Sequence, residues 1–261
     1  MAVGAYARAE SGWFRVTRTP VRLAGLQQPL RALHLADLHS SHAVPTPLLV
    51  DAVGAGIAQK PDIIFLTGDY ISSFRHFDEQ GLRSLFRAMA RTAPTFAVMG
   101  NHDERRGSSE YLQGVLEGEG VAVLHNRSEI VTVQDQKLEL VGLGDLWNLT
   151  EFDPRVAFAE VVERGGFPRI VLAHNPDTKD AIEHLDWDLM LSGHTHGGQV
   201  VLPFVEPSWA PVRDKRFIEG LHTWSGRQLY ITRGVGNHSG LRFACRPEVS
   251  VLEFHPDSSN V

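Results

Sequence analysis

The chain has 261 residues, of which 43% are hydrophobic and 21% are charged, which predicts a globular protein with a substantial core. Its formal net charge of -6 disfavours broad nucleic-acid binding, because that mode of binding depends on Lys and Arg neutralising phosphates. Its single cysteine, Cys245, excludes an intramolecular disulfide, and no apolar run approaches the roughly 20 residues of a membrane-spanning helix.

Short apolar segments alternate with helical patterns in the first half of the chain. Strands are predicted over residues 31–36, 62–66 and 95–99, and each runs into polar residues. Between them, residues 47–60 and 77–91 place apolar side chains at helical spacing. Strands that alternate with helices imply right-handed crossovers and a largely parallel sheet. In such sheets, ligand sites lie beyond the carboxyl ends of the strands.

The second half of the chain repeats this pattern less regularly. Six further strands are predicted, over residues 129–133, 137–141, 170–173, 189–191, 229–232 and 249–254. The first two form a strand pair, and the last two enclose a loop rich in Gly, Pro and Arg. No internal repeat or convincing linker separates the halves. We therefore predict one domain over residues 1–261, with an N-terminal extension over 1–30 and with C-terminal strands and substrate loops over 200–261.

Polar residues gather in five short segments at the ends of predicted strands. These segments are Asp37-Leu38-His39, Gly68-Asp69, Gly100-Asn101-His102-Asp103, His174-Asn175 and Gly193-His194-Thr195-His196-Gly197-Gly198-Gln199. Imidazole, carboxylate and amide oxygen without thiolate suit Mn²⁺, Fe or Zn²⁺ in a catalytic site. In extended backbone, residues two apart point the same way, so Asp37 and His39 are expected to face one cavity, as are His194 and His196. The glycines beside them are expected to make the sharp turns.

In these motifs and their order, the chain resembles the calcineurin-like metallophosphoesterases across residues 31–199. Further matching segments are Leu202-Pro203-Phe204, Tyr230 to Gly236, Arg242-Phe243 and Arg246 to Val249, and these are similar to the bacterial branch of YaeI- and YkuE-type phosphodiesterases and UDP-2,3-diacylglucosamine pyrophosphatases of lipid A biosynthesis. The resemblance implies an α/β fold in which two mixed β-sheets form a sandwich flanked by helices, in four αββα layers.

The same resemblance implies a binuclear metal centre. One metal would be held by Asp37, His39 and His196, the other by Asn101, His174 and His194, and Asp69 would bridge both. We expect two divalent ions, with Mn²⁺ as the first choice and Zn²⁺ or Fe as alternatives. Two such cations can share a water molecule, lower its pKa and hold the phosphate oxygens during in-line attack.

The residues after Asn101 are assigned to proton transfer. His102 is predicted to protonate the leaving group. Asp103 is predicted to orient His102 and to favour its protonated form, with a helix N-cap as the alternative.

Residues of the late loops are assigned to the substrate. Arg233, Asn237 and Arg242 are predicted to bind a phosphate or an anionic head group, because Arg can grip such groups through two parallel hydrogen bonds. An apolar lip over residues 202–209 is expected either to receive an acyl chain or to cap the core.

These observations predict a hydrolase of phosphodiester or pyrophosphate bonds, acting on a lipid-linked or sugar-nucleotide substrate such as UDP-2,3-diacylglucosamine. One alternative is a phosphodiesterase of nucleotides or nucleic acid, and another is a non-catalytic metal-binding scaffold. The presence of His102 favours an enzyme, because a metal store needs no proton donor. We expect a cytoplasmic protein, or one at the periphery of the bacterial inner membrane that is bound through Trp13 and Phe14.

Overall fold

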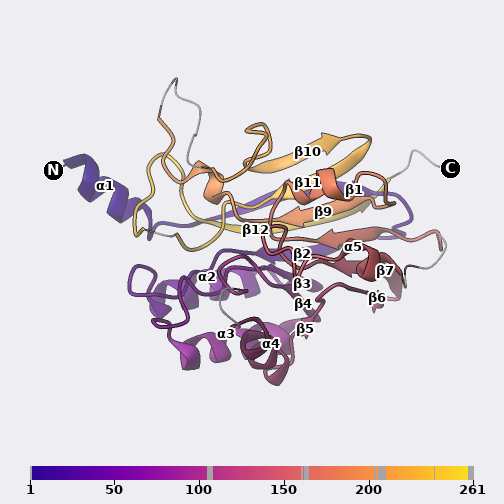
Figure 1. Cartoon of the computed structure of the whole chain (residues 1–261), viewed down its shortest axis with the longest axis horizontal. Coiled ribbons are helices and arrows are strands. Elements are labelled where there is room, and N and C mark those ends of the chain that lie inside the picture. Colours follow the sequence, from indigo (N-terminus) through magenta and orange to yellow (C-terminus); the bar gives the residue numbers. More distant parts are fainter. Residues whose placement is uncertain are drawn as a thin grey trace.

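The strands of the chain form two sheets of six strands each, which lie face to face in the computed structural model (Figure 1). The structure describes residues 2–104, 108–159, 161, 165–202, 204, 210–237 and 239–257. The first sheet has the order β1 (Arg15–Leu23), β12 (Glu248–Pro256), β2 (Leu30–Leu35), β3 (Ile63–Thr67), β4 (Thr95–Val98) and β5 (Ala122–Val123). From β2 to β5 neighbouring strands are parallel, whereas β12 is antiparallel to β2 and parallel to β1.

The second sheet has a parallel centre and antiparallel edges. Its order is β10 (Gly220–Trp224), β11 (Arg227–Ile231), β9 (Leu189–Ser192), β8 (Arg169–Leu172), β7 (Gln136–Gly142) and β6 (Arg127–Val133). The pairs β10–β11 and β6–β7 are antiparallel, and the strands between them are parallel. Two short helices, α5 (Pro154–Ala159) and α6 (Thr178–Ala181), belong to this half of the chain.

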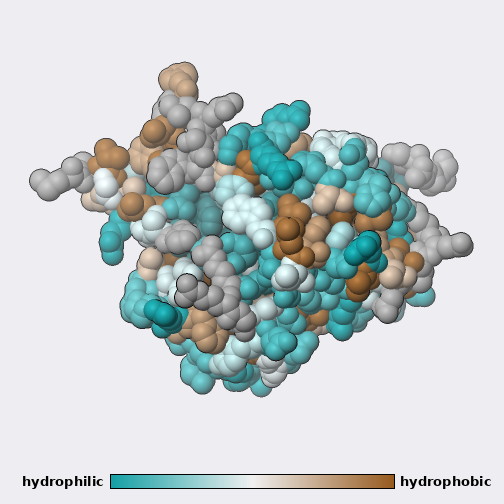
Figure 2. Space-filling view, viewed as in Figure 1, coloured by the Kyte–Doolittle hydropathy of each residue, from teal (hydrophilic) through white to brown (hydrophobic). Residues whose placement is uncertain are grey.

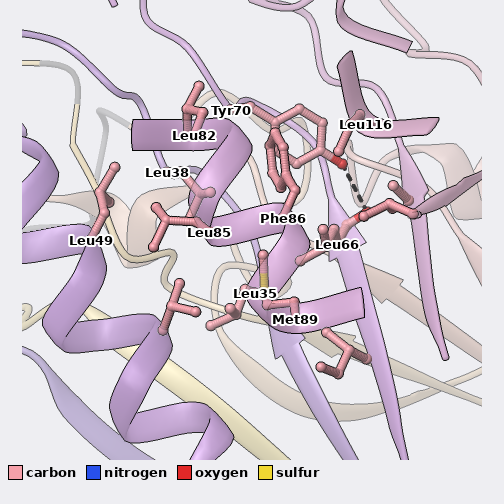
Figure 3. Packing of buried hydrophobic residues seen from close by; sticks show 14 of the residues in the cluster. Leu35, Leu38, Leu49, Leu66, Tyr70, Leu82, Leu85, Phe86, Met89 and Leu116 are labelled. Carbon is pink, nitrogen blue, oxygen red and sulfur yellow. Dashed lines mark hydrogen bonds between the residues drawn. The ribbon is translucent and has the colours of Figure 1, made fainter. Parts of the chain in front are cut away.

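Three longer helices cover the outer face of the first sheet. They are α2 (Thr46–Ile57), α3 (Glu79–Thr92) and α4 (Ser108–Gly118). α3 begins at Asp78, whose carboxylate accepts a hydrogen bond from Gly81 N at 3.0 Å and so caps the first turn. Its buried residues Leu82, Leu85, Phe86 and Met89 recur at helical spacing and lie together in the core shown in Figure 3.

The alternation of side chains along the strands divides the core into layers. In β3, Ile64 and Leu66 pack against the helices, whereas Ile63 and Phe65 pack between the two sheets. The Tyr70 hydroxyl is buried in the helix-side core and donates to Leu66 O at 3.2 Å (Figure 3). Both sheets therefore bury apolar residues on their two faces, which leaves their polar residues at the strand ends.

The predicted fold class, two mixed sheets in a sandwich flanked by helices, is confirmed. The parallel arrangement predicted from alternating strands and helices is observed for β2, β3 and β4. The later strands form a second sheet, except for β12, which pairs within the first. Strands β1, β5 and β10 were not predicted. Within the described residues, no helix combines the length and the apolar character needed to cross a bilayer.

Candidate metal centre

The polar segments meet where the central parallel strands of both sheets end. Asp37 and Asp69 follow β2 and β3 of the first sheet, and His174 and His194 follow β8 and β9 of the second. Backbone hydrogen bonds tie neighbouring loops together, from Asp37 N to Gly68 O at 2.9 Å and from Gly193 N to His174 O at 3.0 Å. The strand ends therefore hold the candidate ligands in one place.

Asp37, His39 and His196 form one buried group of potential metal ligands. One ligand atom from each side chain lies within 4.8 Å of the others. The distance from His196 Nε2 to Asp37 Oδ1 is 3.4 Å, and that from His39 Nε2 to His196 Nε2 is 3.2 Å. The three side chains thus point to a common centre.

Asp69, His174 and His194 form a second such group, again within 4.8 Å. His174 Nε2 lies 3.3 Å from Asp69 Oδ2 and 3.1 Å from His194 Nδ1. The same Asp69 Oδ2 lies 3.4 Å from His39 Nε2 of the first group. Asp69 therefore stands between the two groups, as expected of a bridging carboxylate.

Two buried atoms of the centre have no hydrogen-bond partner among the described residues: Asn101 Oδ1 and His194 Nε2. A buried polar atom without a partner is costly unless a ligand or an ion satisfies it. With the carboxylates of Asp37 and Asp69, these atoms complete a donor set that suits divalent cations such as Mn²⁺ or Zn²⁺. The residues present therefore fit a pair of divalent cations.

The protonation states of the centre are shifted by burial and by neighbouring charges. Burial opposes ionisation of Asp69, but His174 holds the pKa of Asp69 well below its usual range, and the Asp69 carboxylate in turn raises the pKa of His174 against the effect of burial. Burial lowers the pKa of His194 to about 3 and that of His196 well below its usual value, and it raises the pKa of Asp37 to about 7. His194 and His196 are thus neutral, the form in which imidazole binds metals.

The candidate ligands adopt an unusual backbone conformation. The left-handed region is occupied by Asp37 (φ 52°), His39 (φ 47°), Asp69 (φ 56°), His194 (φ 70°) and His196 (φ 51°). This conformation costs about 1 to 3 kcal/mol for each residue that is not glycine, and such strain clusters at functional sites. The expectation of extended backbone at these pairs is therefore wrong, since left-handed turns aim the side chains.

The glycines beside the ligands serve both turning and close approach. Gly68 (φ 85°) and Gly197 (φ 61°) adopt the left-handed conformation of the predicted turns. A Cβ atom on Gly193 would lie 2.5 Å from Asp37 Oδ2, and one on Gly100 would collide with Asp69 Oδ1. Neither glycine has a positive φ angle, so a side chain is excluded there by space alone.

Hydrogen bonds outside the two groups fix the imidazole rings. His174 Nδ1 lies 2.7 Å from Thr67 O, and His39 Nδ1 lies 3.2 Å from Ser72 Oγ. Such outer partners orient a metal-binding histidine and determine which nitrogen faces the metal.

His102 lies beside this centre, as predicted. Its backbone N–H donates to Asp69 Oδ1 at 2.8 Å, and its Nδ1 lies 3.0 Å from Ser72 O. The His102 ring contacts the His39 ring edge to face, with 5.0 Å between centroids. A carbonyl oxygen only accepts, so this contact requires a proton on His102 Nδ1.

The Asp103 side chain has contacts that its predicted role did not include. Its buried carboxylate accepts hydrogen bonds from backbone N–H groups. The donors are Asp69 N (2.7 Å), Tyr70 N (2.9 Å), Gly100 N (3.0 Å) and Ile71 N (3.3 Å). The predicted alternative, an N-cap, is not observed, since α4 begins at Ser108. Asp103 instead ties the Asp69 loop to the Asn101 loop, because turns in both loops leave backbone donors without sheet partners.

Asp103→Asn is expected to lower the free energy of unfolding by about 2 kcal/mol or more, because the new amide group faces backbone donors that then lack an acceptor. Urea unfolding followed by circular dichroism measures this change. The matched control is Asp51→Asn, at an exposed position of α2, for which a change within about 0.5 kcal/mol is expected. Equal stability of the two variants would contradict the assigned role.

The three residues predicted to bind substrate are not among those that line the pocket over the candidate metal centre. Arg242 is fully buried, and its guanidinium donates to His196 O at 3.0 Å, Arg233 O at 2.7 Å and Gly236 O at 2.5 Å. Arg233 pairs with Glu219. The buried Asn237 accepts from Gly240 N. The prediction that Arg242 binds substrate is thus wrong. Its guanidinium is buried and donates to carbonyl groups of the late glycine-rich loop.

Arg242 also supports the metal centre, since its Nη2 lies 3.4 Å from His196 Nδ1. Arg242→Met is expected to lower the free energy of unfolding by about 3 kcal/mol or more, because several buried carbonyl oxygens lose their donor. Thermal and urea unfolding measure the loss. For the exposed Arg155, the change Arg155→Met is expected to be neutral within about 0.5 kcal/mol. If both variants unfold alike, Arg242 has no such supporting role.

A pocket of about 590 Å³ opens over the centre. It is lined by Asp69, Asn101, His102, Trp147, His194, Thr195, His196, Gln199, Val200, Pro211, Ser239 and Leu241. Sequence reasoning missed Trp147, whose ring stands edge to face on His194 with 4.4 Å between centroids. Trp147 could have been predicted from its position, because it follows the end of β7, which is parallel to the strand that precedes His174.

The predicted apolar lip is described only in part. Leu202 and Phe204 are exposed, whereas residues 203 and 205–209 lie outside the described residues. Val200, which the lip prediction did not include, lines the pocket.

Two buried ligand groups, with Asp69 of the second group also close to His39 of the first, lie at an open pocket and define a candidate two-metal hydrolase centre. Residues 30–198 match the calcineurin-like phosphoesterase family, and the chain belongs to this family. It is thus a metallophosphoesterase, that is, a hydrolase.

Relatives of the chain support this assignment. The chain is 44% identical to phosphodiesterase YaeI of Escherichia coli over 94% of this chain and 89% of that protein. It is 26% identical to UDP-2,3-diacylglucosamine pyrophosphatase LpxG of Chlamydia trachomatis over 93% of this chain and 90% of that protein. The structure of Haemophilus influenzae NAD nucleotidase matches 81% of this chain and 46% of its own with a TM-score of 0.52 at 17% identity, which shows a shared fold.

Proposed function

We propose that the chain hydrolyses a phosphodiester or pyrophosphate bond with two divalent cations, with Mn²⁺ as the first choice. Asp37, His39 and His196 would hold one cation, Asn101, His174 and His194 the other, and Asp69 both. The observation that carries this proposal is the position of Asp69 Oδ2, which lies 3.4 Å from His39 Nε2 and 3.3 Å from His174 Nε2. Two such cations supply Lewis acidity and activate water.

The side chains around the cations would bind and protonate the substrate. His102 lines the pocket, and the contact of its Nδ1 with Ser72 O leaves proton exchange to Nε2. A protonated His102 would give its proton to the leaving oxygen, which lowers the barrier to bond cleavage. Asp103 and Arg242 would act as positioning residues, since they hold the loops that carry Asp69, Asn101 and His196.

We propose a lipid-linked or sugar-nucleotide substrate, such as UDP-2,3-diacylglucosamine. The apolar side chains that line the pocket include those of Trp147, Val200, Pro211 and Leu241. Pockets that bind amphipathic molecules combine such side chains with a few polar groups that fix orientation. The name of the LpxG relative supports the same class. The net charge of -6 speaks against the alternative of a nucleic-acid substrate.

Assay of Mn²⁺-loaded protein against two substrates tests the proposal. We expect hydrolysis of both bis(p-nitrophenyl) phosphate and UDP-2,3-diacylglucosamine. Hydrolysis of the first alone would remove the lipid assignment. Absence of both activities in a metal-loaded, folded sample would favour the metal-binding scaffold.

We further propose a location in the cytoplasm or at the inner-membrane periphery. Phe14 is partly buried against the core, so we assign the membrane contact mainly to Trp13. Trp13 is 58% exposed, with the Arg246 guanidinium 4.0 Å from its ring centroid. An aromatic ring beside a cation suits the surface of an anionic membrane. Cosedimentation with anionic vesicles, which Trp13→Ala is expected to weaken, tests the contact.

A further inference from the structure

A third group of metal-ligand side chains lies outside the centre described above. Glu104, His125 and Glu151 each offer one ligand atom within 4.8 Å of the others. His125 Nε2 lies 3.0 Å from Glu151 Oε2. The three residues line a separate pocket of about 540 Å³, together with residues such as Asn148 and Thr150. The side chains of His125 and Glu151 are 23% and 34% exposed, so the pocket is open to ions from solution.

Glu104 carries a buried carboxylate that its neighbours satisfy only in part. The residue is 6% exposed, and its Oε1 accepts from Asp145 N at 3.1 Å, but its Oε2 has no hydrogen-bond partner among the described residues. Burial raises the pKa of Glu104 to about 8. Asp145 N and the Asn148 side chain offset the burial of this carboxylate only in part, and a cation would stabilise its charged form further. His125 Nδ1 is likewise buried and unsatisfied within the described part of the chain.

Hydrogen bonds hold the segments around this group in place. Asn126, next to His125, donates from Nδ2 to Glu151 O at 2.5 Å. Its Oδ1 accepts from Gly144 N at 3.1 Å and from Asp153 N at 3.2 Å. The segments that carry His125 and Glu151 are thus fixed to each other before any ion binds, which is the preorganisation that a metal site requires.

We propose that Glu104, His125 and Glu151 form a third divalent-cation site, which binds Zn²⁺ independently of the binuclear centre. One imidazole and two carboxylates provide three ligands for Zn²⁺, and water from the pocket would complete its coordination. The ion would link Glu104 to the segment that ends at Glu151. This segment includes Trp147, which lines the active pocket. Occupancy of the site would therefore restrict the movement of Trp147.

Equilibrium dialysis against Zn²⁺ at buffered free concentration, followed by elemental analysis, tests the proposal. We expect three equivalents in the wild-type protein and two in His125→Gln and in Glu151→Gln. Both changed side chains are partly exposed, so we expect the variants to fold, which thermal unfolding in the presence of a chelator checks. The matched controls are His222→Gln and Glu129→Gln, which lie outside the pocket and should keep three equivalents.

Two results would overturn the third site: only two equivalents in the wild-type protein, or three equivalents retained in both variants. Failure of the binuclear centre gives a different result. In that case the wild-type protein would bind a single equivalent, and His125→Gln would remove it. A second measurement is the rise in melting temperature on addition of Zn²⁺, because binding to the folded state alone stabilises it. This rise should be smaller in Glu151→Gln than in Glu129→Gln.

Discussion

His102→Ala is expected to lower the turnover number by about 10²-fold or more, because the leaving oxygen loses its proton donor. The content of both cations should stay unchanged, since His102 belongs to neither ligand group. Steady-state kinetics with bis(p-nitrophenyl) phosphate, together with elemental analysis of the same samples, measures the two effects separately.

The matched control is His76→Ala, because His76 is exposed and lies outside the pocket. This variant should retain wild-type turnover. A substrate with a better leaving group needs less protonation, so the loss in His102→Ala should shrink as the leaving group becomes more acidic. A loss that is constant across leaving groups, or one accompanied by loss of metal, would assign His102 a supporting role.

Asp69→Asn is expected to release both cations and to abolish detectable turnover. The amide retains the size of the carboxylate and can still accept the backbone N–H of His102, but it lacks the charge that both ligand groups share. Loss of an outer partner of a ligand weakens metal binding by about 10- to 100-fold, and loss of a shared ligand should cost more. Elemental analysis after dialysis gives the metal content.

Asp51→Asn again serves as the control for a change from carboxylate to amide, and it should keep both cations. Retention of both cations by Asp69→Asn would mean that Asp69 is not a bridge. Retention of one would show that the two ligand groups bind their ions independently.

The meeting of the candidate ligands could be predicted from their places along the chain. Asp69 and His174 follow strands that are central and parallel, and the carboxyl ends of such strands share one edge. The left-handed backbone of His39 could not be predicted, because only a few per cent of residues other than glycine adopt it, although histidine is enriched among them. The burial of Arg242 could not be predicted either, because its guanidinium donates to distant carbonyl groups. One of them belongs to His196, 46 residues away.

The fold was predictable where the pattern is local and strong. α3 repeats its apolar residues at helical spacing, and β6 and β7 form the predicted pair. β1 escaped prediction because most of its residues are exposed or partly exposed and because it contains Pro20. β5 has two residues, too few to give a period. The pairing of β12 with β2 joins distant segments, and no local pattern reveals such a partner.

The position of β12 between β1 and β2 affects how the protein is made. While a ribosome extends the chain, β1 and β2 emerge early, but the strand that joins them is synthesised only after every strand of the other sheet. Until then one edge of β2 stays unpaired, and an unpaired edge can associate with other chains. Gly234 lies against Asp37, and its carbonyl oxygen accepts a hydrogen bond from Glu248 N of β12. This contact can form only after β12 has been synthesised. Metal loading should therefore be a late event in biogenesis, after translation of residues 248–256.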